Sequence, residues 1–174
     1  SILKFVMEQS VNLSDEKKAL IDGIVANREG IDTKTEEWPD EFSTGYDTKF
    51  LGDNYEVSHP TFPSDLKGDI VTQRNGDTVL NYTHFSIVMS KSRRLAYYTV
   101  VNIDGKRLVN IGRENNWTFD PRIEEEYQCG PELYDNNDID KGHLVRRRDP
   151  VWGDTANEAN KDTFHYTNSS PQHK

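Results

Sequence analysis

The sequence of 174 residues predicts an α+β fold with a central antiparallel sheet. Residues 79–109 are rich in β-branched and aromatic side chains separated by short polar turns, which is typical of successive strands. Apolar residues recur at helical spacing over residues 15–29, and a shorter helix fits the stretch after Asp154. The 3 Trp, 8 Tyr and 7 Phe supply large side chains for a core, although only 33% of residues are hydrophobic.

The part before the sheet divides into a helix and a long irregular segment. Ser14 is followed by two acidic residues, which is an N-cap signal, and an apolar stripe continues toward Gly30. We therefore expect an amphipathic helix over residues 15–29. Proline and glycine punctuate residues 31–70, which we expect to be irregular. Aromatic side chains should hold this segment in place, namely Trp38, Phe42, Tyr46, Phe50 and Tyr55.

The later elements follow from the same patterns. We expect strands at residues 79–82, 85–89 and 95–101, of which the last has the strongest strand composition. Asp104 and Gly105 form a hairpin-type turn that leads into residues 107–109. A loop should then run to about residue 138. Asp154 is a suitable cap for a final helix that contains Ala156, Ala159 and Asp162.

The charge of the chain is unevenly distributed. The net charge is −9, of which residues 1–70 contribute −8 and residues 140–174 contribute +1. Taken alone, the total argues against a protein that binds nucleic acid. However, the acidity lies far from the cluster at Arg146, Arg147 and Arg148, which a polyanion could approach because salt screens distant charges. The simpler interpretation of that cluster is a solvated face. We divide the chain into an acidic segment at residues 1–70 and a core at residues 71–174.

Several kinds of site are excluded by the sequence. The single cysteine, Cys129, allows neither an internal disulfide nor a CxxC metal site, and it has no basic neighbour in sequence that would make it a nucleophile. The five histidines show no zinc spacing, and the sequence has no hydrolase nucleophile elbow and no glycine-rich phosphate loop. No apolar run approaches the ~20 residues of a membrane span.

The remaining candidate for chemistry is the stretch around His143. A neutral imidazole at this position could activate water, and Gly142 would let the backbone approach a ligand closely. Lys141 and the three arginines after it could hold a phosphodiester and offset charge during its displacement. The alternative is that His143 is a structural histidine.

Residues 140–143, Asp-Lys-Gly-His, resemble the Asp-Arg-Gly-His signature of the DNA/RNA non-specific endonuclease family, the ββα-metal or His-Me finger nucleases. Residues 162–172 are similar to that family's Thr-Phe-x-x-(Ser/Thr)-Asn-x-x-Pro-Gln segment. Upstream, a third block resembles the family's Arg/Trp/Asp-Pro region, with Arg113, Trp117, Asp120 and Pro121. The resemblance covers roughly residues 80–174 and does not extend to residues 1–70. It implies a ββα-metal motif at the C-terminal end of the sheet.

The resemblance also implies a role for each matching residue. His143 would be the general base that deprotonates the attacking water, and Asp140 would orient the signature loop or hold His143 through its backbone. Arg113 would contact the scissile phosphate, with Arg122 as an alternative. Flanking phosphates would be bound by Lys141, Arg146, Arg147 and Arg148. Asn168 and Gln172 would brace a metal site, although a purely structural role is an alternative for both and for Asp140. We expect His165 and His173 at the surface or at helix ends, and assign no role to His59 or His84.

The sequence departs from the family pattern at two points. Lys141 stands where the family usually has Arg, which keeps the charge but loses the bidentate fork. The family's Asn that binds Mg²⁺ directly would lie beyond Lys174, so we expect no certain metal ligand in this sequence. Three explanations are open: cleavage with the remainder as a second chain, a truncated sequence, or a family remnant that binds nucleic acid without cutting it.

The leading hypothesis is an endonuclease that hydrolyses DNA and RNA without sequence preference and depends on Mg²⁺ or another divalent cation such as Mn²⁺. One rival is a catalytically silent module that binds nucleic acid or protein. Another is an enzyme that acts on other phosphodiesters, such as nucleotides or cell-wall components. We expect no membrane partner, and a homodimer is possible. No signal segment is visible, so both a cytoplasmic location and secretion after processing are compatible with the sequence.

Overall fold

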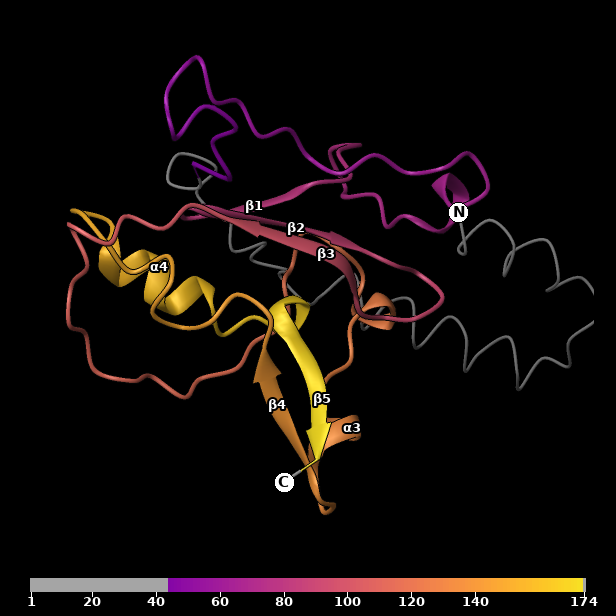
Figure 1. The fold of residues 1–174 in the computed structure, drawn as a ribbon. Helices are drawn as coiled ribbons and strands as arrows, with labels where there is room; N and C mark the ends of the chain where they lie inside the picture. Colours follow the sequence, from indigo (N-terminus) through magenta and orange to yellow (C-terminus); the bar gives the residue numbers. More distant parts are fainter. Residues whose placement is uncertain (1–43, 174) are drawn as a thin grey trace, which may run out of the picture. The chain divides into compact units, whose positions relative to one another are not determined.

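The computed structural model describes residues 44–173 (Figure 1). The helix predicted over residues 15–29, together with Trp38 and Phe42, lies outside them. The strands are β1 (Leu80–Tyr82), β2 (Phe85–Met89), β3 (Ala96–Val101), β4 (Ile139–His143) and β5 (Ser169–His173). The helical elements are η2 (Lys67–Asp69), η3 (Glu125–Tyr127), α3 (Pro131–Tyr134), α4 (Ala156–Asp162) and η4 (Tyr166–Asn168). The predicted α+β class with antiparallel strands is confirmed. None of the helices within residues 44–173 is long and apolar enough to cross a membrane.

The central sheet has the strand order β1-β2-β3, with both pairs antiparallel. All three strands coincide with the predicted ranges to within one residue. The hairpin expected from Asp104 into residues 107–109 is wrong. The turn at Asp104 forms, but Leu108 makes an isolated bridge to Trp152, and the Val109 amide donates to the Val151 carbonyl at 3.0 Å. The chain therefore leaves the sheet after β3, because residues 108 and 109 pair with a distant loop.

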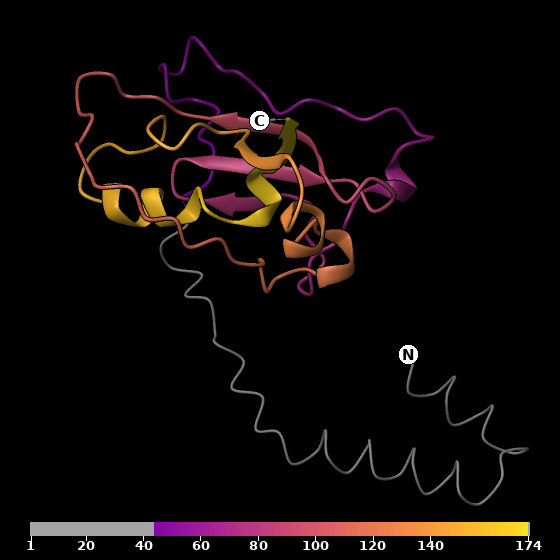
Figure 2. The same cartoon turned by 90° about the horizontal axis from the view of Figure 1, so that it is seen from below.

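A second sheet consists of β4 and β5 alone. The two strands are antiparallel, and Asp140 lies opposite Gln172 while His143 lies opposite Ser169. Figure 1 shows this ribbon projecting away from the central sheet, and Figure 2 shows it nearly end-on. The sequence did not predict a strand at β4, and the loop expected up to residue 138 contains η3 and α3. The final helix is present as α4, but its N-cap is Thr155 rather than Asp154.

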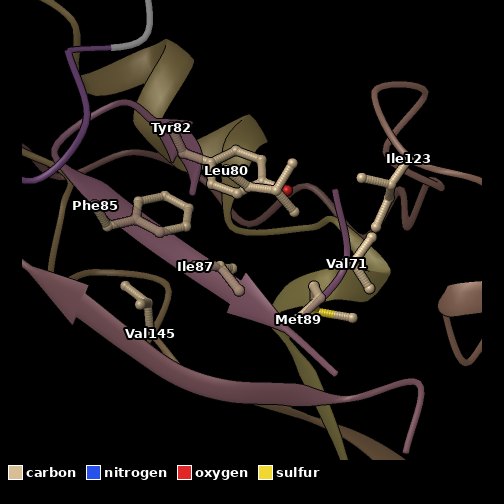
Figure 3. Packing of buried hydrophobic residues seen from close by; sticks show 8 residues of the cluster. All are labelled: Val71, Leu80, Tyr82, Phe85, Ile87, Met89, Ile123 and Val145. Atoms are coloured by element: carbon tan, nitrogen blue, oxygen red, sulfur yellow. The ribbon is translucent and has the colours of Figure 1, made fainter. Parts of the chain in front are cut away.

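The main core lies against the face of the central sheet that carries Leu80 and Ile87. Figure 3 shows the buried cluster, in which the rings of Tyr82 and Phe85 stack with centroids 4.8 Å apart. The hydroxyl of Tyr82 donates to the Asp120 carboxylate and is 2.7 Å from Thr167 Oγ1. The core therefore includes a hydrogen-bonded group of three buried polar side chains, which ties the sheet to the chain on either side of β4.

The opposite face of the sheet is covered by the segment that starts at residue 44. The Gly45 amide donates to the Tyr82 carbonyl at 2.9 Å, and the Tyr46 amide donates to Ser86 Oγ at 2.8 Å. The rings of Tyr46 and Phe50 make aromatic contacts, as expected. Tyr55 is 69% exposed, so the expectation that it anchors this segment is wrong. The predicted division of the chain at residue 70 stays a prediction.

Candidate functional site

The strand β4 determines which signature residues share a face. Successive side chains of a strand point to opposite sides, so Asp140 and Gly142 share one face while Lys141 and His143 share the other. Asp140 is exposed. The Lys141 ammonium lies 5.1 Å from the centroid of the Tyr134 ring, a cation–π contact. The chain therefore brings Lys141 and His143 to one aromatic surface and leaves Asp140 on the other side.

The His143 imidazole lies in an aromatic corner. Its ring centroid is 4.8 Å from that of Trp117 and 5.0 Å from that of Phe164. Its Nε2 is buried, and no hydrogen-bond partner for it exists within residues 44–173. Burial, together with the positive charges of Arg113 and Arg147, lowers the pKa of His143 to about 4. The imidazole is therefore neutral near pH 7 and can accept a proton.

Gly142 allows an unusually close contact across the two-stranded sheet. A Cβ atom at this position would lie 2.1 Å from Cδ and 2.2 Å from Nε2 of Gln172, far inside van der Waals distance. The Gln172 side chain thus lies directly over the Gly142 backbone, on the face of the strand that carries Asp140 and opposite to the face that carries His143. Any larger residue at position 142 would displace it.

Asn168 is fully buried and connects the two halves of the signature region. Its Oδ1 accepts a hydrogen bond from the Val145 amide at 2.8 Å. Its Nδ2 donates to the carbonyls of Val145 and Thr163, both at 3.0 Å. Both atoms of the amide are therefore used by the backbone, and Asn168 fixes the chain that follows His143 against the chain that precedes β5.

The predicted cluster of three arginines consists of residues in three different environments. Arg147 Nη1 donates to the Ile111 carbonyl at 3.0 Å and to Asn160 Oδ1 at 3.1 Å, so this residue is anchored. Arg146 forms an ion pair with Asp149, and Arg148 is exposed. Of the three, Arg147 is the one whose charge lowers the pKa of His143.

Two arginines outside that cluster also differ in their surroundings. Arg113 is exposed, and its guanidinium lies 6.0 Å from the Phe164 ring, beside His143. Arg122, the sequence alternative to Arg113, pairs with the buried Asp120 carboxylate at 2.7 Å and lies 4.6 Å from the Tyr82 ring. The geometry therefore favours Arg113 as the guanidinium next to His143.

The other histidines and Cys129 are placed elsewhere. The expectation of a surface position is wrong for His165, which is buried with its Nδ1 3.0 Å from the Asp162 carbonyl; it does follow the end of α4. His173 is exposed at the end of β5. His84 stacks on Trp152 and is hydrogen-bonded through both ring nitrogens, which the sequence did not reveal. Cys129 is buried and its pKa is raised by burial, as suits an unreactive thiol.

The described residues do not fit a complete cation site. Within residues 44–173 there is no group of three or more His, Cys, Asp or Glu side chains that could hold a metal ion. Asn168, which the sequence placed near a metal, directs both of its amide atoms to the backbone. Gln172 is exposed over Gly142.

A neutral histidine therefore ends the short strand β4, with the guanidinium groups of Arg113 and Arg147 close enough to act on its pKa. The profile of the DNA/RNA non-specific endonuclease family matches residues 63–174, and the chain belongs to this family. The chain is also 53% identical over 108 residues to the uncharacterized protein y4fB of Sinorhizobium fredii (strain NBRC 101917 / NGR234). That match covers 56% of this chain and 16% of the relative, so the chain spans a small part of the length of that protein.

Proposed function

We propose that this chain carries the catalytic site of an endonuclease that hydrolyses DNA and RNA phosphodiester bonds without sequence preference. Family membership supports the nuclease class. The observation that carries the proposal is the surroundings of His143, which combine a low pKa with two guanidinium groups from separate segments, Arg113 and Arg147. A general base must be neutral before the reaction, and His143 meets that condition.

In this mechanism His143 accepts a proton from the water that attacks phosphorus. The P–O bond to the leaving nucleotide oxygen breaks as the new P–O bond forms, and that oxygen takes a proton from solvent. A base with a pKa of about 4 is weak at pH 7, but a bound phosphate brings negative charge next to it. That charge would offset Arg113 and Arg147, so the pKa of His143 would rise toward the working pH when substrate binds. The same two guanidinium groups would stabilise the charge that develops on the phosphate oxygens.

The other predicted site residues have supporting roles in this proposal. Lys141, Arg146 and Arg148 would bind flanking phosphates, which makes the affinity depend steeply on salt. Asp140 would orient the signature strand from its outer face. Asn168 and Gln172 would brace the site, the first through the Val145 backbone and the second over Gly142. The strands β4 and β5 would form the two strands of the ββα-metal motif.

The proposal includes a divalent cation, Mg²⁺ or Mn²⁺, because the family is generally dependent on one. The family resemblance implies that an Asn binds this cation directly. The chain covers 16% of the y4fB relative, and the cation site, a second chain and a homodimer partner are part of this proposal. None of the steps assigned to His143, Arg113 or Arg147 passes through that cation.

A binding module without catalysis is the second candidate. It is favoured by Asn168, which the family resemblance places near the metal but whose amide atoms both bond to the backbone. Such a protein would keep the phosphate contacts and lose only the cleavage step.

A nicking assay distinguishes the two candidates. Supercoiled plasmid and a single-stranded RNA are incubated with the protein in Mg²⁺ and then with EDTA, and binding is followed by gel shift. We expect cleavage of both nucleic acids in Mg²⁺ and none in EDTA. Binding without cleavage in either condition would support the silent module. Absence of both binding and cleavage would contradict both candidates.

A further inference from the structure

Trp117 is brought to His143 by pairing between two segments far apart in the sequence. Thr118 forms a parallel bridge with His165. Its amide donates to the Phe164 carbonyl, and the Tyr166 amide donates to its carbonyl, both at 3.0 Å. This pairing fixes Trp117 next to the end of β4. The position of the indole is therefore built into the fold rather than left to a mobile side chain.

The indole and Phe164 form two walls around the imidazole. The ring of Trp117 is tilted by 55° to that of His143, and the ring of Phe164 is nearly perpendicular to it, at 85°. The two walls also contact each other, with centroids 5.4 Å apart. Phe164 is 1% exposed and belongs to the interior, whereas Trp117 is half-buried. Trp117 is thus the wall that separates the imidazole from solvent.

The orientation of the imidazole depends on this packing. A catalytic histidine is usually held by a hydrogen bond from its second ring nitrogen to a carbonyl or carboxylate. Within residues 44–173, Nε2 of His143 is buried without such a partner. We propose that Trp117 is a positioning residue, whose indole fixes the orientation of the His143 ring and keeps water from one side of it. The proposal rests on the proposed function only for the claim that His143 is a base.

The charged and titratable groups around His143 limit what else could have this effect. Arg113 approaches from the segment before Trp117, and Arg147 from the turn after β4. The ring centroid of Tyr166 lies 6.0 Å from that of the Trp117 indole. Burial raises the pKa of Tyr166, so its hydroxyl is neutral. On β5 the residue opposite is Ser169, which carries no charge. Trp117 is accordingly the half-buried side of this corner, and it can be replaced without changing a charge.

The test is an NMR titration of the His143 C2 proton in the full chain, assigned by its loss in His143→Asn. In the wild type we expect a pKa of about 4. In Trp117→Ala the ring becomes hydrated, so its pKa should rise toward the ordinary value of about 6.5. Trp117→Phe should retain most of the depression. Leu144→Ala is the control, because Leu144 is adjacent to His143 but 40% exposed, and it should leave the titration unchanged.

The outcomes separate this inference from the proposed function. An unchanged pKa in folded Trp117→Ala would overturn the role of Trp117, whatever the cleavage activity. If that variant does not fold, Trp117→Leu replaces it, with a smaller rise expected and the same outcome against the idea. Where cleavage is measurable, the acid limb of the kcat/KM profile should move to higher pH in the same order of variants. A shifted pKa with no cleavage by any variant would contradict the nuclease proposal alone.

Discussion

Asn168→Ala should destabilise the protein strongly, because Asn168 is a buried residue whose side chain is fully hydrogen-bonded. The change removes three hydrogen bonds, two to Val145 and one to Thr163. The two bonds that Nδ2 donates contribute about 1 kcal/mol each, and leaving the buried Val145 amide without its acceptor costs about 1–3 kcal/mol more. We therefore expect the free energy of unfolding to fall by roughly 3–5 kcal/mol.

Urea denaturation followed by circular dichroism measures this loss. Asn168→Asp is the matched variant, since it keeps an acceptor for the Val145 amide but directs a carboxylate oxygen at two carbonyls, and it should be at least as destabilising. Asn116→Ala, at an exposed asparagine, should change the unfolding free energy by less than about 0.5 kcal/mol. If Asn168→Ala lowers the unfolding free energy by less than about 1 kcal/mol, these three hydrogen bonds do not stabilise the fold as we infer.

Three further predictions follow from the site. Gly142→Ala should displace Gln172 and slow cleavage at least tenfold, but the unfolding free energy should change by less than about 1 kcal/mol because Gln172 is exposed. The control is Gly112→Ala, since Gly112 has open space around it, and this variant should have the wild-type cleavage rate and stability. Equal cleavage rates in the two variants would contradict a role for the contact between Gly142 and Gln172. Arg113→Gln should weaken DNA binding and cleavage without changing stability. Arg147→Gln should weaken both and also lower the melting temperature, because Arg147 donates hydrogen bonds to Ile111 and Asn160. Indistinguishable melting curves for the two variants would contradict a structural role for these hydrogen bonds. The pKa of His143 is about 4 when folded and about 6.5 when unfolded, so the unfolded chain takes up the proton first. Unfolding free energy should therefore fall as pH drops from about 6.5 toward 4, and His143→Gln should flatten this slope in urea melts; parallel slopes would exclude a depressed pKa.

The central sheet could be predicted because its signal is local. Each of its strands has its own β-branched and aromatic residues, and polar turns mark their ends. β4 could not be predicted in this way, since Ile-Asp-Lys-Gly-His lacks an alternating pattern. It becomes a strand because β5, which begins at Ser169, pairs with it. Residues 107–109 do not continue the sheet for a related reason, because Leu108 pairs instead with Trp152 in a distant loop.

The site was partly visible in the sequence. The signature located His143, but not the rings around it, because Trp117 and Phe164 come together only through pairing of distant segments. The sequence predicts one basic cluster from the three consecutive arginines. Their side chains point in different directions, and of the three it is Arg147 that lowers the pKa of His143. The residues around His84 in the sequence did not indicate its buried, hydrogen-bonded position either. It adopts a φ of 68°, which is uncommon for a residue other than glycine.

The most direct test of the central claim is the single-turnover rate of plasmid cleavage in Mg²⁺ by the wild type and by His143→Asn. His173→Asn is the control, because it removes a histidine at the other end of the two-stranded sheet. If His143 is the general base, its loss should lower the rate by about 10²–10⁴ while the Kd for DNA stays within about twofold, and the control should cleave normally. A His143→Asn rate equal to that of the wild type would contradict the assignment.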